Sequence, residues 1–338
     1  MGMLISIFTT AVVFFGTLAL VNFASLSLWR RSFRTYGNRA QIGGTEIFYR
    51  LQGEGPVTAV VCTDLGSTSA EWSHIAESLA SEVRVLTYDR PGYGFSGRPK
   101  SPRTPENIAA ELKDLIDASC ITGPLVLIGH GQGGLYAQKF IRMYPGDVLA
   151  AIFIDPFTAE EGVFKVEGKA REYQRSGLDK SSSLKTYRVL SNLGIVRLFE
   201  PIIAKIPPLN HMRAPSPETK RNILQAMNSP LLYRTAIEEY TLARKPKHIE
   251  GLASPDGFPP IPITLLLHDP RVIIEEIVLY RGLAEPEARD VEDIWRRIME
   301  RYLSFSPQST LVTVQGGSHF CHLDSEETVL EAIRKAIR

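Results

Sequence analysis

A glycine-rich turn in the middle of the chain is the place where chemistry would be expected. The apolar run Leu125–Ile128 is followed by Gly129-His130-Gly131-Gln132-Gly133-Gly134, after which an amphipathic helical pattern begins. This pattern predicts a strand, a sharp turn and a helix. Such a turn exposes its central residue, which in many acyl-transferring enzymes is a nucleophilic serine. Gly131 stands at the centre here, so the oxygen that would carry an acyl group is missing.

Short apolar runs alternate with helical patterns along most of the chain. The strands are expected at residues 45–49, 59–62, 83–88, 125–128, 150–156, 261–267 and 309–314. Helices are expected from about residue 70, over 105–118, after the glycine turn, over 291–303 and from residue 326 onward. This alternation predicts an α/β fold with a mostly parallel, doubly wound sheet.

Length and composition exclude several classes of protein. The 338 residues, 44% of them hydrophobic, fit one α/β domain with an insertion. A net charge of +1 gives no support for a nucleic-acid partner. Cys62, Cys120 and Cys321 are widely spaced in apolar settings, so we expect small buried thiols in a reducing compartment rather than disulfides or a metal site. No cofactor is indicated.

The N-terminal segment has the composition of a membrane anchor. No charged residue occurs from Met3 to Trp29, and this length of apolar helix can cross a bilayer. A cleavable signal peptide would have a basic start and a shorter apolar core. Arg30, Arg31, Arg34 and Arg39 follow the segment, which predicts a single-pass protein whose globular part lies on the cytoplasmic or equivalent organellar side.

Between residues 157 and 260 the strand pattern stops, and Lys, Arg, Glu and Leu dominate. We therefore divide the chain into an anchor (1–30), a linker (31–43), an α/β core (44–156 and 261–338) and an inserted helical cap (157–260). The apolar face of the cap is expected to pack over the sheet. Alternatively, that face lines an apolar pocket or touches lipid beside the anchor.

Four motifs occurring in this order resemble the α/β-hydrolase superfamily over nearly all of residues 44–338, and in particular its membrane-anchored members. They are Tyr88-Asp89-Arg90-x-Gly92-x-Gly94-x-Ser96, Gly129-His130-x-Gln132-Gly133-Gly134, Ile154-Asp155 and Gly317-Ser318-His319-Phe320-x-His322-Leu323-Asp324. The resemblance implies an α/β-hydrolase fold. The glycine-punctuated loop from Asp89 to Gly97 is interpreted as a structural turn.

The resemblance also implies roles for individual residues. His319 matches the histidine that takes the proton of the serine, and His322 is expected to be structural. The carboxylate that orients the histidine is either Asp155 or Asp269; we prefer Asp155, because the loop with Asp269 departs from the spacing of the family. Gly131 is then the vestigial position of the nucleophile.

The oxyanion hole of the family combines two backbone amides. By resemblance these are the amide of Gln132 and, from the loop after the third strand, that of Leu65. Asp64 takes the place of a glycine in that loop. Facing the donors, its carboxylate would oppose a developing oxyanion; turned outward, it would cap the next helix.

Three functions remain open at this stage. The leading hypothesis is a membrane-tethered protein that has lost serine-hydrolase activity and serves a binding or structural role, with an apolar small molecule, a lipid or a membrane protein as its partner. The second is an esterase or lipase in which Gly131 replaces a natural serine. In the third, His319 activates water in the space at the apex of the turn.

Overall fold

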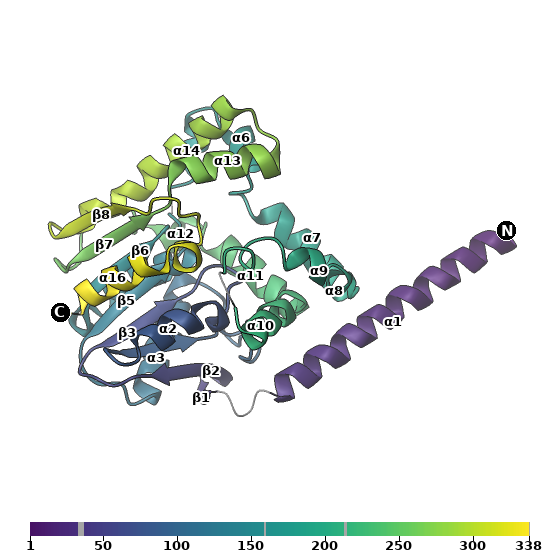
Figure 1. The fold of residues 1–338 in the computed structure, drawn as a ribbon, viewed down its shortest axis with the longest axis horizontal. Helices are drawn as coiled ribbons and strands as arrows, with labels where there is room; N and C mark the ends of the chain where they lie inside the picture. The colour runs from purple at the N-terminus through teal and green to yellow at the C-terminus, as the bar shows by residue number, and fades with distance from the viewer. Residues whose placement is uncertain (33–36, 159, 213–214, 338) are drawn as a thin grey trace.

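An eight-stranded sheet forms the centre of the protein, in the strand order β1-β2-β4-β3-β5-β6-β7-β8 (Figure 1). The structure is a computed structural model that describes residues 1–32, 37–158, 160–212 and 215–337. The strands are β1 (Asn38–Ile42), β2 (Thr45–Gln52), β3 (Thr58–Cys62), β4 (Arg84–Tyr88), β5 (Leu125–His130), β6 (Val148–Ile154), β7 (Ile263–Leu267) and β8 (Ser309–Thr313). All neighbours from β4 to β8 are parallel, whereas β1 and β2 are antiparallel.

Alternate residues of the central strands face two separate apolar clusters. In β3, Val60 and Cys62 belong to one cluster, and Ala59 and Val61 belong to the other. The first cluster is completed by α3 (Pro105–Ala118), α4 (Gln132–Met143), α13 (Pro270–Arg281) and α14 (Glu285–Met299). The second is completed by α2 (Ser73–Leu79) and α16 (Glu326–Ala336). The predicted doubly wound α/β fold is confirmed.

The hairpin at the start of the sheet falls inside the segment that the sequence analysis assigned to a linker. Ile42 pairs with Thr45 across the two-residue turn Gly43-Gly44, where both glycines have positive φ (54° and 75°). Two positive-φ residues between short strands are typical of a hairpin turn. The sheet therefore begins at Asn38, six residues before the expected start of the core.

Helices occupy the chain between β6 and β7. They are α5 (Gly162–Val166), α6 (Ala170–Ser176), α7 (Ser181–Asn192), α8 (Ile195–Leu198), α9 (Glu200–Ile203), α10 (Pro217–Met227), α11 (Pro230–Leu242) and α12 (Pro246–Ile249). Helix α11 packs beside the loops that follow β3 and β4, since Leu232 lies against Gly66 and Thr235 against Gly92. This inserted segment thus lies close to the edge of the sheet at which the parallel strands end.

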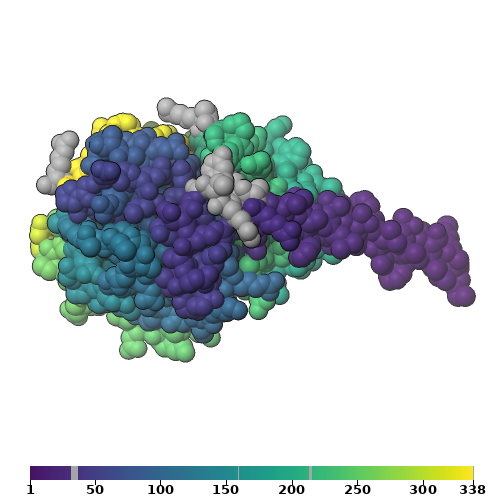
Figure 2. Space-filling model, turned by 90° about the horizontal axis from the view of Figure 1, so that it is seen from below, coloured from purple at the N-terminus to yellow at the C-terminus, as the bar shows by residue number. Residues whose placement is uncertain are grey.

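The N-terminal helix α1 (Gly2–Ser32) projects from the globular domain (Figures 1 and 2). Its first half is exposed, and its C-terminal end contributes Leu26 and Trp29 to a third apolar cluster. Among the described helices, only the stretch Gly2–Arg31 is long and apolar enough to cross a membrane. Arg34, one of the arginines used to predict sidedness, lies outside the described residues.

Candidate functional site

The glycine turn connects β5 to α4 and requires glycine at several positions. Gly131 has φ 51° and ψ −124°, a backbone conformation that L side chains rarely adopt. A Cβ added to Gly133 would lie 2.0 Å from the carbonyl oxygen of Cys62, so the first turn of α4 packs directly against the end of β3. The turn thereby brings the backbone N–H of Gln132, at the start of α4, beside the loop that follows β3.

His319 is paired with Asp155 at the end of β6. The distance from His319 Nδ1 to Asp155 Oδ2 is 2.5 Å, and Asp155 is buried. Asp269, the alternative acid, does not contact His319. Its carboxylate caps α13 by accepting the N–H of Arg271 at 3.0 Å, and it forms an ion pair with the guanidinium of Arg271. Of the two candidates, the structure brings only Asp155 to the histidine.

Asp64 occupies the space above Gly131. One carboxylate oxygen, Oδ2, lies 3.2 Å from Nε2 of His319, and the other, Oδ1, accepts the backbone N–H of Gln132 at 2.6 Å. A Cβ built on Gly131 would lie 2.1 Å from Oδ1 and 2.9 Å from Cβ of Asp64. The carboxylate therefore takes the room that a side chain at position 131 would need.

The outward orientation considered for Asp64 is not observed. The carboxylate faces the turn, and the 3₁₀ helix Ser69–Trp72 that follows has Thr68 at its N-cap position without a side-chain cap. Leu65, expected to supply the second amide donor, comes next in the loop, and its side chain packs against the cluster that contains Leu232. Gly131, Asp155, His319 and the Gln132 amide lie together at this edge of the sheet. The carboxylate of Asp64 joins them.

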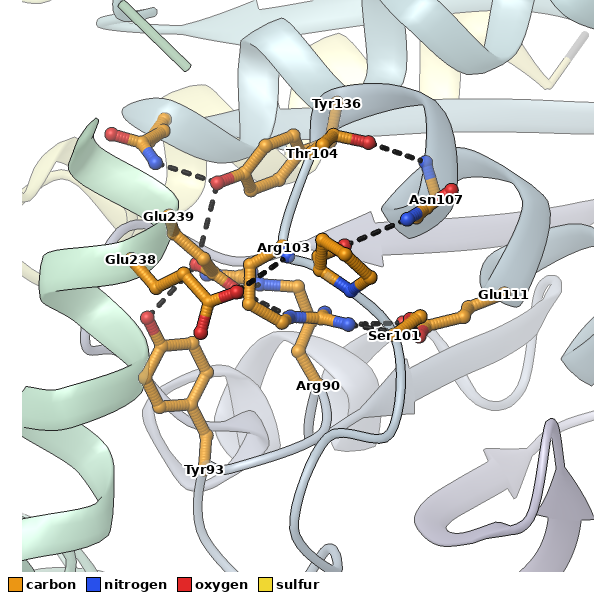
Figure 3. Close-up of polar contacts among 12 residues, drawn as sticks. Arg90, Tyr93, Ser101, Arg103, Thr104, Asn107, Glu111, Tyr136, Glu238 and Glu239 are labelled. Carbon is orange, nitrogen blue, oxygen red and sulfur yellow. Dashed lines mark hydrogen bonds and ion pairs between the residues drawn. The ribbon is translucent and has the colours of Figure 1, made fainter. Parts of the chain in front are cut away.

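A buried ion pair holds the loop of Asp64 in place. Arg90 donates from Nη1 to the carbonyl oxygen of Thr63 at 2.7 Å and from Nη2 to that of Asp64 at 2.9 Å. The same guanidinium pairs with Glu239 of α11 at 3.0 Å, and the two side chains are 1% and 0% exposed. Figure 3 shows Arg90, Tyr93 and Tyr136 converging on Glu239. The inserted segment thus helps to fix the site.

Sequence reasoning missed Glu239 because no local pattern marks it. It lies 149 residues from Arg90 in the chain, within an ordinary amphipathic helix. The available signal was a glutamate on the buried face of that helix, since a carboxylate there requires a charged partner. The loop that carries Arg90 is structural, as predicted: Asp89 accepts the N–H groups of Ser69 and Phe95.

The charges in the site favour a protonated His319. Burial alone would lower the pKa of this imidazole, but its hydrogen bonds to Asp155 and Asp64 and their negative charges raise it to about 9. Burial would raise the pKa of each aspartate, but the contacts with His319 and, for Asp155, first with His268 hold both well below the usual range. A protonated Nε2 cannot accept a proton, which argues against the activation of water by His319.

A second histidine continues the network into the core. His268 Nδ1 lies 2.5 Å from Asp155 Oδ1, and its Nε2 lies 2.8 Å from Oε1 of Glu292 in α14. Burial opposes protonation, but Asp155 and Glu292 raise the pKa of His268 to about 10. Asp155 thus contacts the rings of both His268 and His319, which fix its orientation from both sides.

His322 lies beside the site without joining its hydrogen bonds to Asp155 or Asp64. Its ring stacks on Trp72 with centroids 4.3 Å apart and planes inclined by 4°.

Within the described parts of the chain, no three His, Cys, Asp or Glu side chains form a group that could hold a metal ion. Cys62 and Cys321 are buried free thiols, whereas Cys120, which follows the end of α3 and has φ 54°, is exposed, contrary to expectation.

Comparison with known proteins places the chain in a family. The profile described as "Alpha/beta hydrolase family" matches residues 59–332. The chain belongs to the alpha/beta hydrolase family. The Cif epoxide hydrolase of Acinetobacter nosocomialis superposes with a TM-score of 0.67 and 15% identity, covering 93% of this chain and 96% of that one. At this identity, the likeness shows the α/β-hydrolase fold alone.

Curated relatives match shorter stretches of this alpha/beta hydrolase. An uncharacterised protein of Bacillus subtilis is 27% identical over 105 residues, which is 31% of this chain and 42% of the relative. An uncharacterised vacuolar membrane protein of Saccharomyces cerevisiae is 37% identical over 78 residues, which is 23% of this chain and 12% of the relative. The chain spans less than half the length of these relatives. The apolar helix α1 and the vacuolar membrane relative support membrane association.

Proposed function

We propose that this chain is a membrane-tethered α/β-hydrolase-fold protein without serine-hydrolase activity, and that its site serves a binding or structural role. The observation that carries the proposal is the position of the Asp64 carboxylate, which bonds both His319 Nε2 and the N–H of Gln132. In a serine hydrolase, the histidine would face the serine hydroxyl and this amide would stabilise the oxyanion. Asp64 engages both groups at once.

The consequence for acyl transfer is severe. Loss of the serine of a triad costs on the order of a millionfold in turnover. A carboxylate on the Gln132 amide also removes a donor for the substrate carbonyl and places a negative charge where another would develop. The structure therefore offers neither a nucleophilic hydroxyl nor a free amide at this position.

The alternative of a natural serine at position 131 requires a rearrangement. Its Cβ would lie 2.9 Å from Cβ of Asp64, and rotating the carboxylate away does not move that atom. A serine held near φ 51° would also cost about 1–3 kcal/mol in backbone strain. Glycine at position 131 leaves the space that the side chain of Asp64 occupies, which favours the proposal over an altered esterase or lipase.

A second candidate function is suggested by the same geometry. Asp64 lies deprotonated above the apex of the turn, held by the Gln132 amide and His319. A carboxylate in that position could open an epoxide: its oxygen bonds to a ring carbon, the ring C–O bond breaks, and the oxygen released takes a proton from water, after which water cleaves the ester on Asp64. The raised pKa of His319, about 9, opposes its use as the base for that second step. We therefore rank this candidate below the first.

Four forms of the full chain distinguish these functions: the unaltered protein, Gly131→Ser, Asp64→Gly and the double variant. We expect a fluorophosphonate probe to label only the double variant, because that variant alone has both a hydroxyl and a free amide. Unfolding temperatures control for misfolding. A stoichiometric adduct on the unaltered chain would overturn the proposal, and strong labelling of Gly131→Ser alone would show that Asp64 does not block the site.

The second candidate has its own test. Single turnover in ¹⁸O-labelled water transfers label to Asp64 if its carboxylate forms and releases an ester. We expect no incorporation with a panel of aliphatic epoxides, and Asp64→Asn serves as the matched control. Label found in the peptide that contains Asp64 would replace the first function with the second.

Sidedness and partners belong to the same proposal. Arg30 and Arg31 end α1, which favours the cytoplasmic or equivalent organellar side for the globular domain. The exposed Cys120 provides the test, because a membrane-impermeant maleimide should label it only after the vesicles are opened. Labelling in sealed, right-side-out vesicles would reverse the assignment. An apolar small molecule or lipid is the proposed ligand, and a membrane protein is the proposed partner.

A further inference from the structure

The C-terminal half of α1 is fixed to the inserted helices by buried polar contacts. Asn22, 2% exposed, donates from Nδ2 to the carbonyl oxygens of Ser191 at 3.0 Å and Asn228 at 3.1 Å, and its Oδ1 accepts from Arg197 at 3.0 Å. Trp29 Nε1 donates to Asn222 Oδ1 at 3.1 Å. Because an asparagine amide in an apolar segment is costly without partners, these bonds are strong constraints. These contacts fix the orientation of α1 relative to the inserted helices.

The turn between α7 and α8 meets α1 at a level that a bilayer would cover. A Cβ on Gly194 would lie 2.5 Å from the carbonyl oxygen of Leu18, so the two backbones touch there. About 20 residues cross a hydrocarbon core of ~30 Å, and counting from Met3 this length ends at Asn22. Leu18 then lies about 6 Å inside that boundary. Shifting the span toward Trp29 places Leu18 deeper still.

The helices beside this contact expose large apolar side chains. Val189 of α7 is 58% exposed, Leu198 at the end of α8 is 52% exposed, Phe199 is 48% exposed, and Ile202 of α9 is 59% exposed. Figure 1 shows α7, α8 and α9 next to α1, and Figure 2 shows the teal and green segments beside the purple helix where it leaves the domain. Several exposed apolar side chains on neighbouring short helices mark an interaction surface rather than ordinary solvent-facing chain.

Basic side chains accompany this surface. Lys185 and Arg188 of α7 and Lys205 after α9 are exposed on the same elements. Apolar residues that reach the acyl chains and lysines or arginines at the level of the headgroups are the pattern of a helix lying in a membrane interface. A protein partner would not require the apolar and basic side chains to lie at matching depths along α1.

We propose that Val189, Leu198, Phe199 and Ile202 form a lipid-inserted face, which holds the globular domain against the same bilayer that α1 spans. The proposal commits to lipid as the occupant of the face, because the contact at Leu18 places it at the depth of the acyl boundary. It rests on the proposed membrane tethering through α1, but not on whether the site at Gly131 is catalytic.

Fluorescence quenching in nanodiscs of phosphatidylcholine and phosphatidylglycerol tests this face in the full chain. In a Cys120→Ser background, single cysteines replace Ile202 or Leu279 and are labelled with NBD; Cys62 and Cys321 are buried. Leu279 of α13 is the matched control, since it is 74% exposed and apolar, and Figure 1 shows α13 away from α1. Val189→Cys gives a second reading on α7, in case labelling at 202 disturbs α9.

We expect NBD at positions 202 and 189 to emit at shorter wavelength than at 279, and to be quenched at least twofold more by lipids with a doxyl group near the headgroup. Equal quenching at 202, 189 and 279 would overturn the proposal. A blue shift without doxyl quenching would also overturn it, because protein rather than lipid would then cover the face.

Discussion

Replacing Asp64 by asparagine removes one of the two negative charges that flank the His319 ring. The shape of the side chain is kept, so the amide can still fill the space above Gly131. In the unaltered protein, the two carboxylates raise the pKa of His319 to about 9 despite burial. The substitution is therefore expected to lower this pKa toward the physiological pH range.

The size of the shift follows from the distance between the two groups. Asp64 Oδ2 and His319 Nε2 are 3.2 Å apart, and the side chains are 20% and 32% exposed. At effective dielectric constants of about 40–80, which suit such partly solvated groups, Coulomb's law gives roughly 1.3–2.6 kcal/mol. This energy corresponds to a fall of about one to two pKa units.

The assay is an NMR titration of protein carrying ¹³C-labelled histidine, with His319→Gln used to assign the resonance. Asp269→Asn is the control, because that carboxylate caps α13 and does not contact His319. The reasoning is refuted if Asp64→Asn leaves the pKa of His319 within a few tenths of a unit of its original value. An equal shift in the control would show that the effect is not local.

Three further outcomes concern stability. Gly133→Ala should destabilise the fold by about 3 kcal/mol in urea unfolding, because its Cβ would meet backbone, whereas Gly146→Ala, with open space around it, should change little. Glu239→Gln should cost about 3–5 kcal/mol, since Arg90 keeps a buried charge; a loss below about 1 kcal/mol would contradict this role. The pKa of His268 is raised to about 10 in the folded protein. Its contribution to the free energy of unfolding is therefore complete below 6.5, the pKa of histidine in the unfolded chain, and is lost as the pH rises toward 10. The slope is at most about 1.4 kcal/mol per pH unit, and His268→Gln should flatten the fall in unfolding temperature between pH 7 and 9.

The spacing of apolar residues predicted most of the strands and helices, because each kind of element buries side chains at its own regular interval. The helix predicted over 105–118 has those bounds in the structure, where Thr104 caps it and Pro105 begins it. The β1–β2 hairpin was missed because its first strand, Asn38–Ile42, is short and polar. The helix expected over 291–303 begins at Glu285 instead, since the apolar spacing marks its buried face and not its first turn.

The sequence by itself determined the fold, the apolar N-terminal helix and the absence of a hydroxyl at position 131, because each of these depends on residue type and spacing along the chain. Only the tertiary structure decided which way the Asp64 carboxylate turns, and that Asp155 rather than Asp269 meets His319. Both orientations depend on contacts between loops that follow different strands. They also depend on the buried Glu239 of α11, which pairs with Arg90 although the two residues are 149 positions apart in the chain. Such contacts leave no periodic trace in the sequence, since they are set by three-dimensional packing and by the cost of burying an unpaired charge.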